Sequence, residues 1–72
     1  MIQIGKRGRI RQGSYAGWYV LIEDDTANTG GYYVYTSRDS DFKGEGYDDW
    51  VENKELLEPF FTESEWEVDW DD

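Results

Sequence analysis

The sequence predicts a mainly β, small α+β fold: an open barrel of about five short antiparallel strands with a short helix before the last strand. Three observations support this prediction. Apolar side chains alternate with polar ones along much of the chain, turn-forming residues separate the alternating stretches, and one stretch near the C-terminal end has helical spacing. Residues 1–72 contain no repeat or linker and are enough for a single acidic β-rich domain.

The first part of the chain predicts strands joined by a turn. Residues 2–4 and 7–11 both alternate, which predicts two short strands or one bent strand. Residues 13–17 are rich in glycine and predict a turn. Residues 18–23 are the strongest predicted strand, because apolar side chains fall on both of its faces.

The middle of the chain predicts a hairpin followed by a polar loop. Residues 24–31 are of turn-forming types and predict a hairpin loop, whereas residues 31–37 predict a second aromatic strand. The alternation stops over residues 38–49, which predicts a polar loop. Trp50 and Val51 then predict a short buried return to the core.

A helix is predicted after Asn53, whose side chain can cap the first turn. The apolar stripe that follows consists of Leu56, Leu57, Phe60 and Phe61. Pro59 leaves two alternatives, an interrupted helix or two short turns of which Pro59 opens the second. Residues 66–70 alternate again and predict a half-buried last strand with an acidic outer row, after which Asp71 and Asp72 are expected to fray.

Composition excludes most kinds of catalytic and metal site. The chain has no Cys and no His, which removes disulfides, thiolate chemistry, most zinc sites and the usual proton shuttle near neutral pH. It has 4 Trp, 6 Tyr and 3 Phe, and because a small domain needs that apolar surface, we expect most rings to lie inside. No apolar stretch is long enough for a membrane span or a signal core. We therefore expect a cytoplasmic protein that is not an enzyme and has no cofactor.

Charge is segregated along the chain. Residues 23–72 carry all 17 acidic side chains against 3 basic ones, and the net charge of the chain is −10. Three arginines share one face of the predicted first strand: Arg7, Arg9 and Arg11. We expect them to pair across strands with acids such as Glu23, Glu67 or Asp69. Alternatively, this arginine face binds the phosphates of single-stranded nucleic acid, although the acidic remainder of the chain repels a polyanion.

Two further patterns partly match known functional sites, a calcium-binding loop and a pair of catalytic carboxylates. Asp39, Asp41 and Gly44 occupy the first, third and sixth positions of a calcium-binding EF-hand loop. Lys43 then stands where an oxygen ligand belongs, and so a solvated or partner-contacting loop is preferred to a metal site. Adjacent Asp pairs, the candidates for acid–base catalysis, occur at residues 24–25 and 48–49. Adjacency in sequence does not set the separation that such catalysis needs.

Acidic side chains are interleaved with large rings in the second half of the chain. Residues 45–72 hold 12 of the 17 acids against one Lys, and this density destabilises a fold through self-repulsion. Residues 47–52 and 65–70 place these acids beside Tyr and Trp. Rings that anchor an interface, surrounded by charges that attract the partner, are typical of fast and tight association. The pattern therefore predicts a docking site for a basic protein.

Residues 17–25 (GWYVLIEDD), 29–32 (TGGY) and 46–52 (GYDDWVE) resemble the small acidic immunity proteins of bacterial polymorphic and contact-dependent toxin systems. Residues 10–22 resemble the first hairpin of SH3-like barrels. The first resemblance implies a cytoplasmic inhibitor that occludes a basic cognate toxin, often a nuclease, without a catalytic residue of its own. On this basis the expected partner-binding residues are Asp24, Asp25, Asp39, Asp41, Tyr47, Asp48, Asp49, Trp50, Glu52 and Glu55.

Two alternative functions remain open at the level of sequence. One is an SH3-like nucleic-acid or ribosome-associated module that uses the arginine face. The other is an acidic DNA mimic that inhibits a DNA-binding protein. For an immunity protein we expect no nucleic-acid, membrane, metal or small-molecule partner, so binding to single-stranded RNA at low salt would favour the first alternative.

Overall fold

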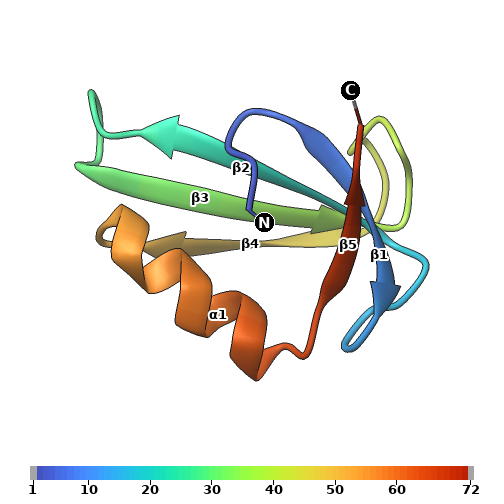
Figure 1. Cartoon of the computed structure of the whole chain (residues 1–72). Coiled ribbons are helices and arrows are strands. Elements are labelled where there is room, and N and C mark those ends of the chain that lie inside the picture. Colours follow the sequence, from blue (N-terminus) through green and yellow to red (C-terminus); the bar gives the residue numbers. More distant parts are fainter. Residues whose placement is uncertain (1, 72) are drawn as a thin grey trace.

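The computed structural model describes residues 2–71 and consists of a five-stranded sheet with one short helical segment (Figure 1). The strands are β1 (Arg7–Gln12), β2 (Tyr19–Asp25), β3 (Gly31–Ser37), β4 (Gly46–Val51) and β5 (Glu67–Trp70). Between β4 and β5, a 3-10 turn, η1 (Lys54–Leu56), leads into the helix α1 (Leu57–Glu63). The predicted mainly β, small α+β fold with a short helix before the last strand is confirmed.

The sheet is open, and its strand order is β4-β3-β2-β1-β5. All neighbouring strands are antiparallel, and the first strand pairs with the last, with Gly8 opposite Trp70. Figure 1 shows β1 and β5 running across the direction of β2, β3 and β4. Gly8 permits this close pairing, because a Cβ atom there would lie 2.9 Å from Trp70 Cε3 and would also collide with Val68. The strands β4 and β5 are left as the two edges of the sheet.

The interior is mainly aliphatic. The fully buried strand residues are Ile10, Val20, Ile22 and Val34, and Leu57 and Phe61 of α1 pack against them. Among residues 2–71, Phe61 is the one buried ring, and the other aromatic side chains are half-buried or exposed. The expectation that most rings lie inside is therefore wrong. A single short helix encloses one face of the sheet, and compact aliphatic side chains are enough to fill that space.

The helical segment begins as the sequence predicts. The Asn53 side chain accepts a hydrogen bond from the Leu56 N–H at 3.1 Å and so caps η1. Pro59 is the third residue of α1, within the first turn, where a backbone N–H has no partner inside the helix. Neither alternative for Pro59 is observed, because η1 is followed by a continuous helix in which Pro59 is neither a break nor the first residue.

Several predicted boundaries are wrong. Residues 2–6 form no strand, and the chain joins the sheet there through one hydrogen bond from the Gly5 N–H to the Ile22 carbonyl at 2.8 Å. The strand β4 covers part of the predicted polar loop, because an edge strand tolerates polar side chains on both faces. Trp50 is 45% exposed, so the predicted buried return holds for Val51 alone.

The chain does not fray at Asp71. Its N–H donates to the Arg7 carbonyl at 2.8 Å, and its carboxylate pairs with the Arg7 guanidinium at 2.6 Å. This pairing continues the β1–β5 ladder by one residue. Asp72 lies outside the described residues. Within residues 2–71, no helix has the length and apolar character needed to cross a bilayer.

Candidate functional site

The strand β4 is an exposed and acidic edge of the sheet. Strand alternation places Asp48 and Trp50 on the outer face and places Tyr47 and Asp49 on the face that bears Val34. All four are exposed. We define the β4 edge as Tyr47, Asp48, Asp49, Trp50 and Glu52. The adjacent Asp pair of the sequence is thus divided between the two faces, which gives a partner access to acidic side chains from either side.

The charges of the β4 edge are not used in the fold. The ion pairs formed among residues 2–71 are Arg7–Asp71, Arg11–Asp69 and Arg38–Glu45. None of them includes Asp48, Asp49 or Glu52, and the β4 edge itself contains no base. Unpaired carboxylates on an edge strand discourage strand addition by a neutral chain and attract a basic one.

Three rings gather where β4 begins. Tyr47 packs against Tyr15 and Trp18 of the β1–β2 connection, with ring centroids 5.2 and 5.9 Å apart. Tyr15 and Trp18 are 4.8 Å apart. We define these three residues as the aromatic cluster. Tyr15 is 45% and Tyr47 is 51% exposed, so the cluster presents a large apolar surface next to the carboxylate of Asp49.

Tyr15 holds its position in the aromatic cluster at a conformational cost. Its φ is 60°, in the left-handed region that a side chain with a Cβ atom disfavours. The electrostatic interaction with Tyr47 raises the pKa of Tyr15, and partial burial and the Asp49 carboxylate act in the same direction. The Arg38 guanidinium lies over the Trp18 ring at 5.6 Å from its centroid. This contact demonstrates that a ring of the cluster accommodates a guanidinium cation.

Trp50 lies at the opposite end of β4 from Tyr47. Its Nε1–H donates to Thr29 Oγ1 at 2.8 Å, which ties the ring to the β2–β3 turn. The ring occupies the space beside Gly31 that a Cβ atom would fill. Trp50 therefore has a structural contact as well as an exposed surface, and the two proposed anchors, Tyr47 and Trp50, do not form one patch.

Asp24 and Asp25 are the last two residues of β2 and border the β2–β3 turn. Asp24 Oδ1 accepts hydrogen bonds from the Thr26 hydroxyl at 2.6 Å and the Thr26 N–H at 3.0 Å, and these bonds lower the pKa of Asp24. Asp25 Oδ1 accepts a bond from the Asn28 side chain at 3.3 Å. Both carboxylates thus stabilise the turn. They lie near the Trp50 end of β4, because β3 lies between β2 and β4 in the sheet and Tyr32 is paired with both Asp24 and Val51.

Asp39 and Asp41 lie in the β3–β4 connection, at the Tyr47 end of β4. Asp41 Oδ1 accepts a hydrogen bond from the Lys43 N–H at 3.2 Å, so this carboxylate closes a local turn. Within residues 2–71, no group of three or more acidic side chains is arranged to hold a metal ion. The connection folds back over the outer face of the sheet, where a hollow of about 440 Å³ lies between Phe42, Leu21 and Tyr35.

The remaining predicted residues follow β4. Glu52 and Glu55 are exposed, and Glu55 belongs to the first turn of η1. The predicted partner-binding residues thus fall into three places: the end of β2, the β3–β4 connection, and β4 with the segment after it. The strand β4 connects these places, and its residues 46–50 are all exposed.

The arginine face of β1 is largely occupied by the protein itself. Arg11 pairs with Asp69 at 2.5 Å, which confirms the predicted cross-strand pairing for that acid. Arg7 pairs with Asp71, and the guanidinium groups of Arg7 and Arg9 lie over the Tyr19 ring at 5.7 and 5.8 Å. Glu23 and Glu67 are not among the observed ion-pair partners.

Sequence reasoning did not find two members of the aromatic cluster. Tyr15 lies between Gly13 and Gly17 in a turn, and a large ring in such a turn is a signal of an exposed contact. Trp18 was expected only to belong to a strand. Their contact with Tyr47 depends on the packing of the β1–β2 turn against β4. This packing cannot be predicted from any local sequence pattern.

Comparison of the chain with protein-family models, with curated proteins and with solved structures found no significant match.

Proposed function

We propose that this protein is an immunity-type inhibitor that binds a basic cognate toxin, a nuclease domain, through the β4 edge and the aromatic cluster. The observation that carries the proposal is the β4 edge, in which unpaired carboxylates flank half-exposed rings. Unpaired like charges on one strand repel one another and so lower the stability of the fold. A basic partner would remove that repulsion.

Inhibition would follow from occupation of the toxin's substrate groove. A nuclease groove is lined by cations that bind phosphate, and Asp48, Asp49 and Glu52 would take the place of the phosphate charges. Tyr47 and Tyr15 would supply the apolar contact that slows dissociation. This mechanism needs no catalytic residue, metal or cofactor on the inhibitor.

The test is affinity capture from the native cell extract with three baits: the wild type, Asp49→Lys and the control Glu63→Lys. The two variants have the same net charge, and both substituted positions are exposed, but Glu63 lies on α1. We expect the wild type and Glu63→Lys to retain one basic protein whose nuclease activity they inhibit, and Asp49→Lys to lose it. Equal retention by all three baits would contradict a role for the β4 edge.

Salt dependence provides a second test of the mechanism. With the captured partner purified, affinity should fall as ionic strength rises, because exposed charges are screened within about 10 Å at 0.1 M salt. An affinity that is independent of salt would contradict charge mimicry. If the captured protein binds DNA without cleaving it, the related function of an acidic DNA mimic replaces the immunity function.

The nucleic-acid alternative has less support. The ion pairs of Arg7 and Arg11 compete with phosphate for the same guanidinium groups, and the net charge of −10 repels a polyanion. A mobility-shift experiment with single-stranded RNA at low salt tests this alternative directly. We expect no shift, and a shift abolished by Arg9→Gln would favour the nucleic-acid function.

A further inference from the structure

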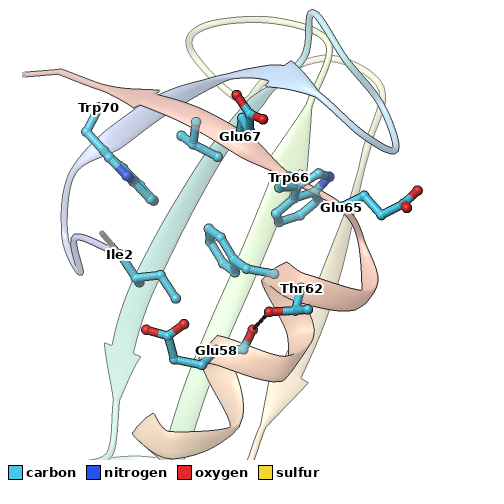
Figure 2. Close-up of a pocket in the computed structure, with 9 residues that line it drawn as sticks. Ile2, Glu58, Thr62, Glu65, Trp66, Glu67 and Trp70 are labelled. Carbon is cyan, nitrogen blue, oxygen red and sulfur yellow. Dashed lines mark hydrogen bonds between the residues drawn. The ribbon is translucent and has the colours of Figure 1, made fainter.

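A second feature lies away from the β4 edge, where α1 and β5 diverge. A pocket of about 570 Å³ opens between them, which is within the range of about 300–1,000 Å³ typical of ligand sites (Figure 2). We call it the α1–β5 pocket. Its lining residues come from the start of the chain, α1 and β5: Ile2, Glu58, Phe61, Thr62, Glu65, Trp66, Glu67, Val68 and Trp70.

The walls of the α1–β5 pocket are aromatic and held in place. The Phe61 ring is stacked on Trp70 with centroids 6.0 Å apart, and it meets Trp66 edge-to-face at 5.0 Å. The Trp66 Nε1–H donates to the Ser14 carbonyl at 2.6 Å, which fixes this indole against the β1–β2 turn. Ile2 and Val68 complete the apolar lining. The pocket is therefore preformed, so an occupant need not reorganise it.

The opening of the pocket is acidic. The lining includes Glu58, Glu65 and Glu67 and no Lys or Arg. Figure 2 shows the Glu58 carboxylate beside Ile2 at the opening, whereas the Glu65 and Glu67 side chains point away from it. Among residues 2–71, none of these three carboxylates takes part in the observed ion pairs or side-chain hydrogen bonds. The apolar interior and the anionic opening complement a side chain with an apolar stem and a cationic end.

We infer that the α1–β5 pocket binds an arginine side chain of the basic partner. The methylene stem of arginine would lie against Phe61 and Val68, and the planar guanidinium would stack on the Trp70 indole and approach the Glu58 carboxylate. Elsewhere in this protein, Arg38 already makes the same kind of contact with Trp18, at 5.6 Å. The inference depends on the proposed function for the basic nature of the partner. It adds a second attachment point on a different part of the molecule.

A short oligoarginine peptide is the probe, with the neutral isostere oligocitrulline and with oligolysine for comparison. Binding to the whole protein is followed by the NMR shifts of the Trp66 and Trp70 indole N–H groups. We expect oligoarginine to shift the Trp70 signal, oligolysine to do so more weakly and oligocitrulline to leave it unchanged. Equal shifts by oligoarginine and oligocitrulline would overturn recognition of a cation.

The matched variants are Glu58→Gln, which lines the pocket, and Glu63→Gln, which lies on the same helix outside it. We expect Glu58→Gln to weaken oligoarginine binding on the order of tenfold, and Glu63→Gln to change it less than about twofold. If both variants weaken oligoarginine binding equally, the peptide is attracted by the general negative charge of the protein and not by the pocket. That result overturns the pocket assignment. Both positions are exposed, so both variants should fold.

A third variant, Asp48→Asn with Asp49→Asn, distinguishes this inference from the proposed function. Suppose this variant binds the captured partner more weakly than the wild type, and oligoarginine never shifts the Trp70 signal. The β4 edge is then supported and the pocket inference is wrong. If the Trp70 signal moves normally and the captured partner still binds this variant as tightly as the wild type, the pocket inference stands and the β4 edge does not.

Discussion

The two edge strands of the sheet, β4 and β5, both carry acidic side chains but use them differently. On β5, Asp69 pairs with Arg11, and Asp71 just beyond it pairs with Arg7. On β4, Asp48 and Asp49 take part in none of the ion pairs among residues 2–71. The difference shows that acidic side chains on the two edges of one sheet can differ in whether they are paired. The carboxylates of β5 stabilise the fold, whereas those of β4 remain available to a partner.

The largest expected effect comes from breaking the β5 edge itself. In Gly8→Val, the new side chain collides with Val68 and Trp70, and we expect the free energy of unfolding to fall by about 1–3 kcal/mol. Urea denaturation measures this loss. The control is Gly44→Val, because its new Cβ atom meets only the side chain of Asp39, which can move. Equal denaturation midpoints for the two variants would contradict the close β1–β5 contact.

A smaller effect is expected from removing the paired charges of β5. Asp69→Asn with Asp71→Asn removes two exposed ion pairs, each of which contributes about 0.2–1 kcal/mol. We expect a stability loss of about 1 kcal/mol that disappears at high salt, where the pairs are screened. A loss that is unchanged by salt would mean that backbone disruption, and not charge, is responsible.

A hydrogen bond on the outer face of the sheet, from Tyr35 to Glu23, gives a pH-dependent test of which acids stabilise the fold. The Tyr35 hydroxyl donates to Glu23 at 2.8 Å, and this bond, with partial burial, raises the pKa of Tyr35 to about 12. Because the protonated form is favoured in the folded state, its contribution to stability is complete below pH of about 10 and is lost between about 10 and 12. Ultraviolet titration should detect a tyrosine that ionises near pH 12, and Tyr35→Phe should remove it while Tyr33→Phe does not.

The smallest effect on stability is expected at β4. Asp48→Asn with Asp49→Asn breaks no observed ion pair and relieves repulsion, so we expect the free energy of unfolding to change by less than about 0.5 kcal/mol. Thermal unfolding measures this value. A loss comparable with that of the β5 variant would remove the distinction between the two edges.

Local patterns were sufficient for most of the fold. Alternation identified β2, β3 and β5, and the capping role of Asn53 was correct because it depends only on the next three residues. The strand β4 was largely missed, since its position comes from pairing with β3 and its own side chains are polar on both faces. The prediction that most rings are buried was wrong, because amino-acid composition does not show how many faces of a sheet are covered.

The candidate site was predictable in part. The sequence identified Tyr47, Asp48 and Asp49 from their interleaved rings and acids, and the fold places them on one exposed strand. Asp24 and Asp25 also form hydrogen bonds to Thr26 and Asn28, a local role that was not predicted from the sequence. The aromatic cluster and the α1–β5 pocket are tertiary features, because each requires segments from distant parts of the chain.

The pairing of β1 with β5 also determines when the protein can fold. The Trp66 indole reaches the Ser14 carbonyl across 52 positions of sequence, and β1 finds its second neighbour only in residues 67–70. A nascent chain therefore cannot complete this sheet until its last strand has left the ribosome. Such non-local pairing raises the contact order and slows folding compared with a helical domain of equal length. A protein built this way completes its sheet only after nearly the whole of this sequence has been synthesised.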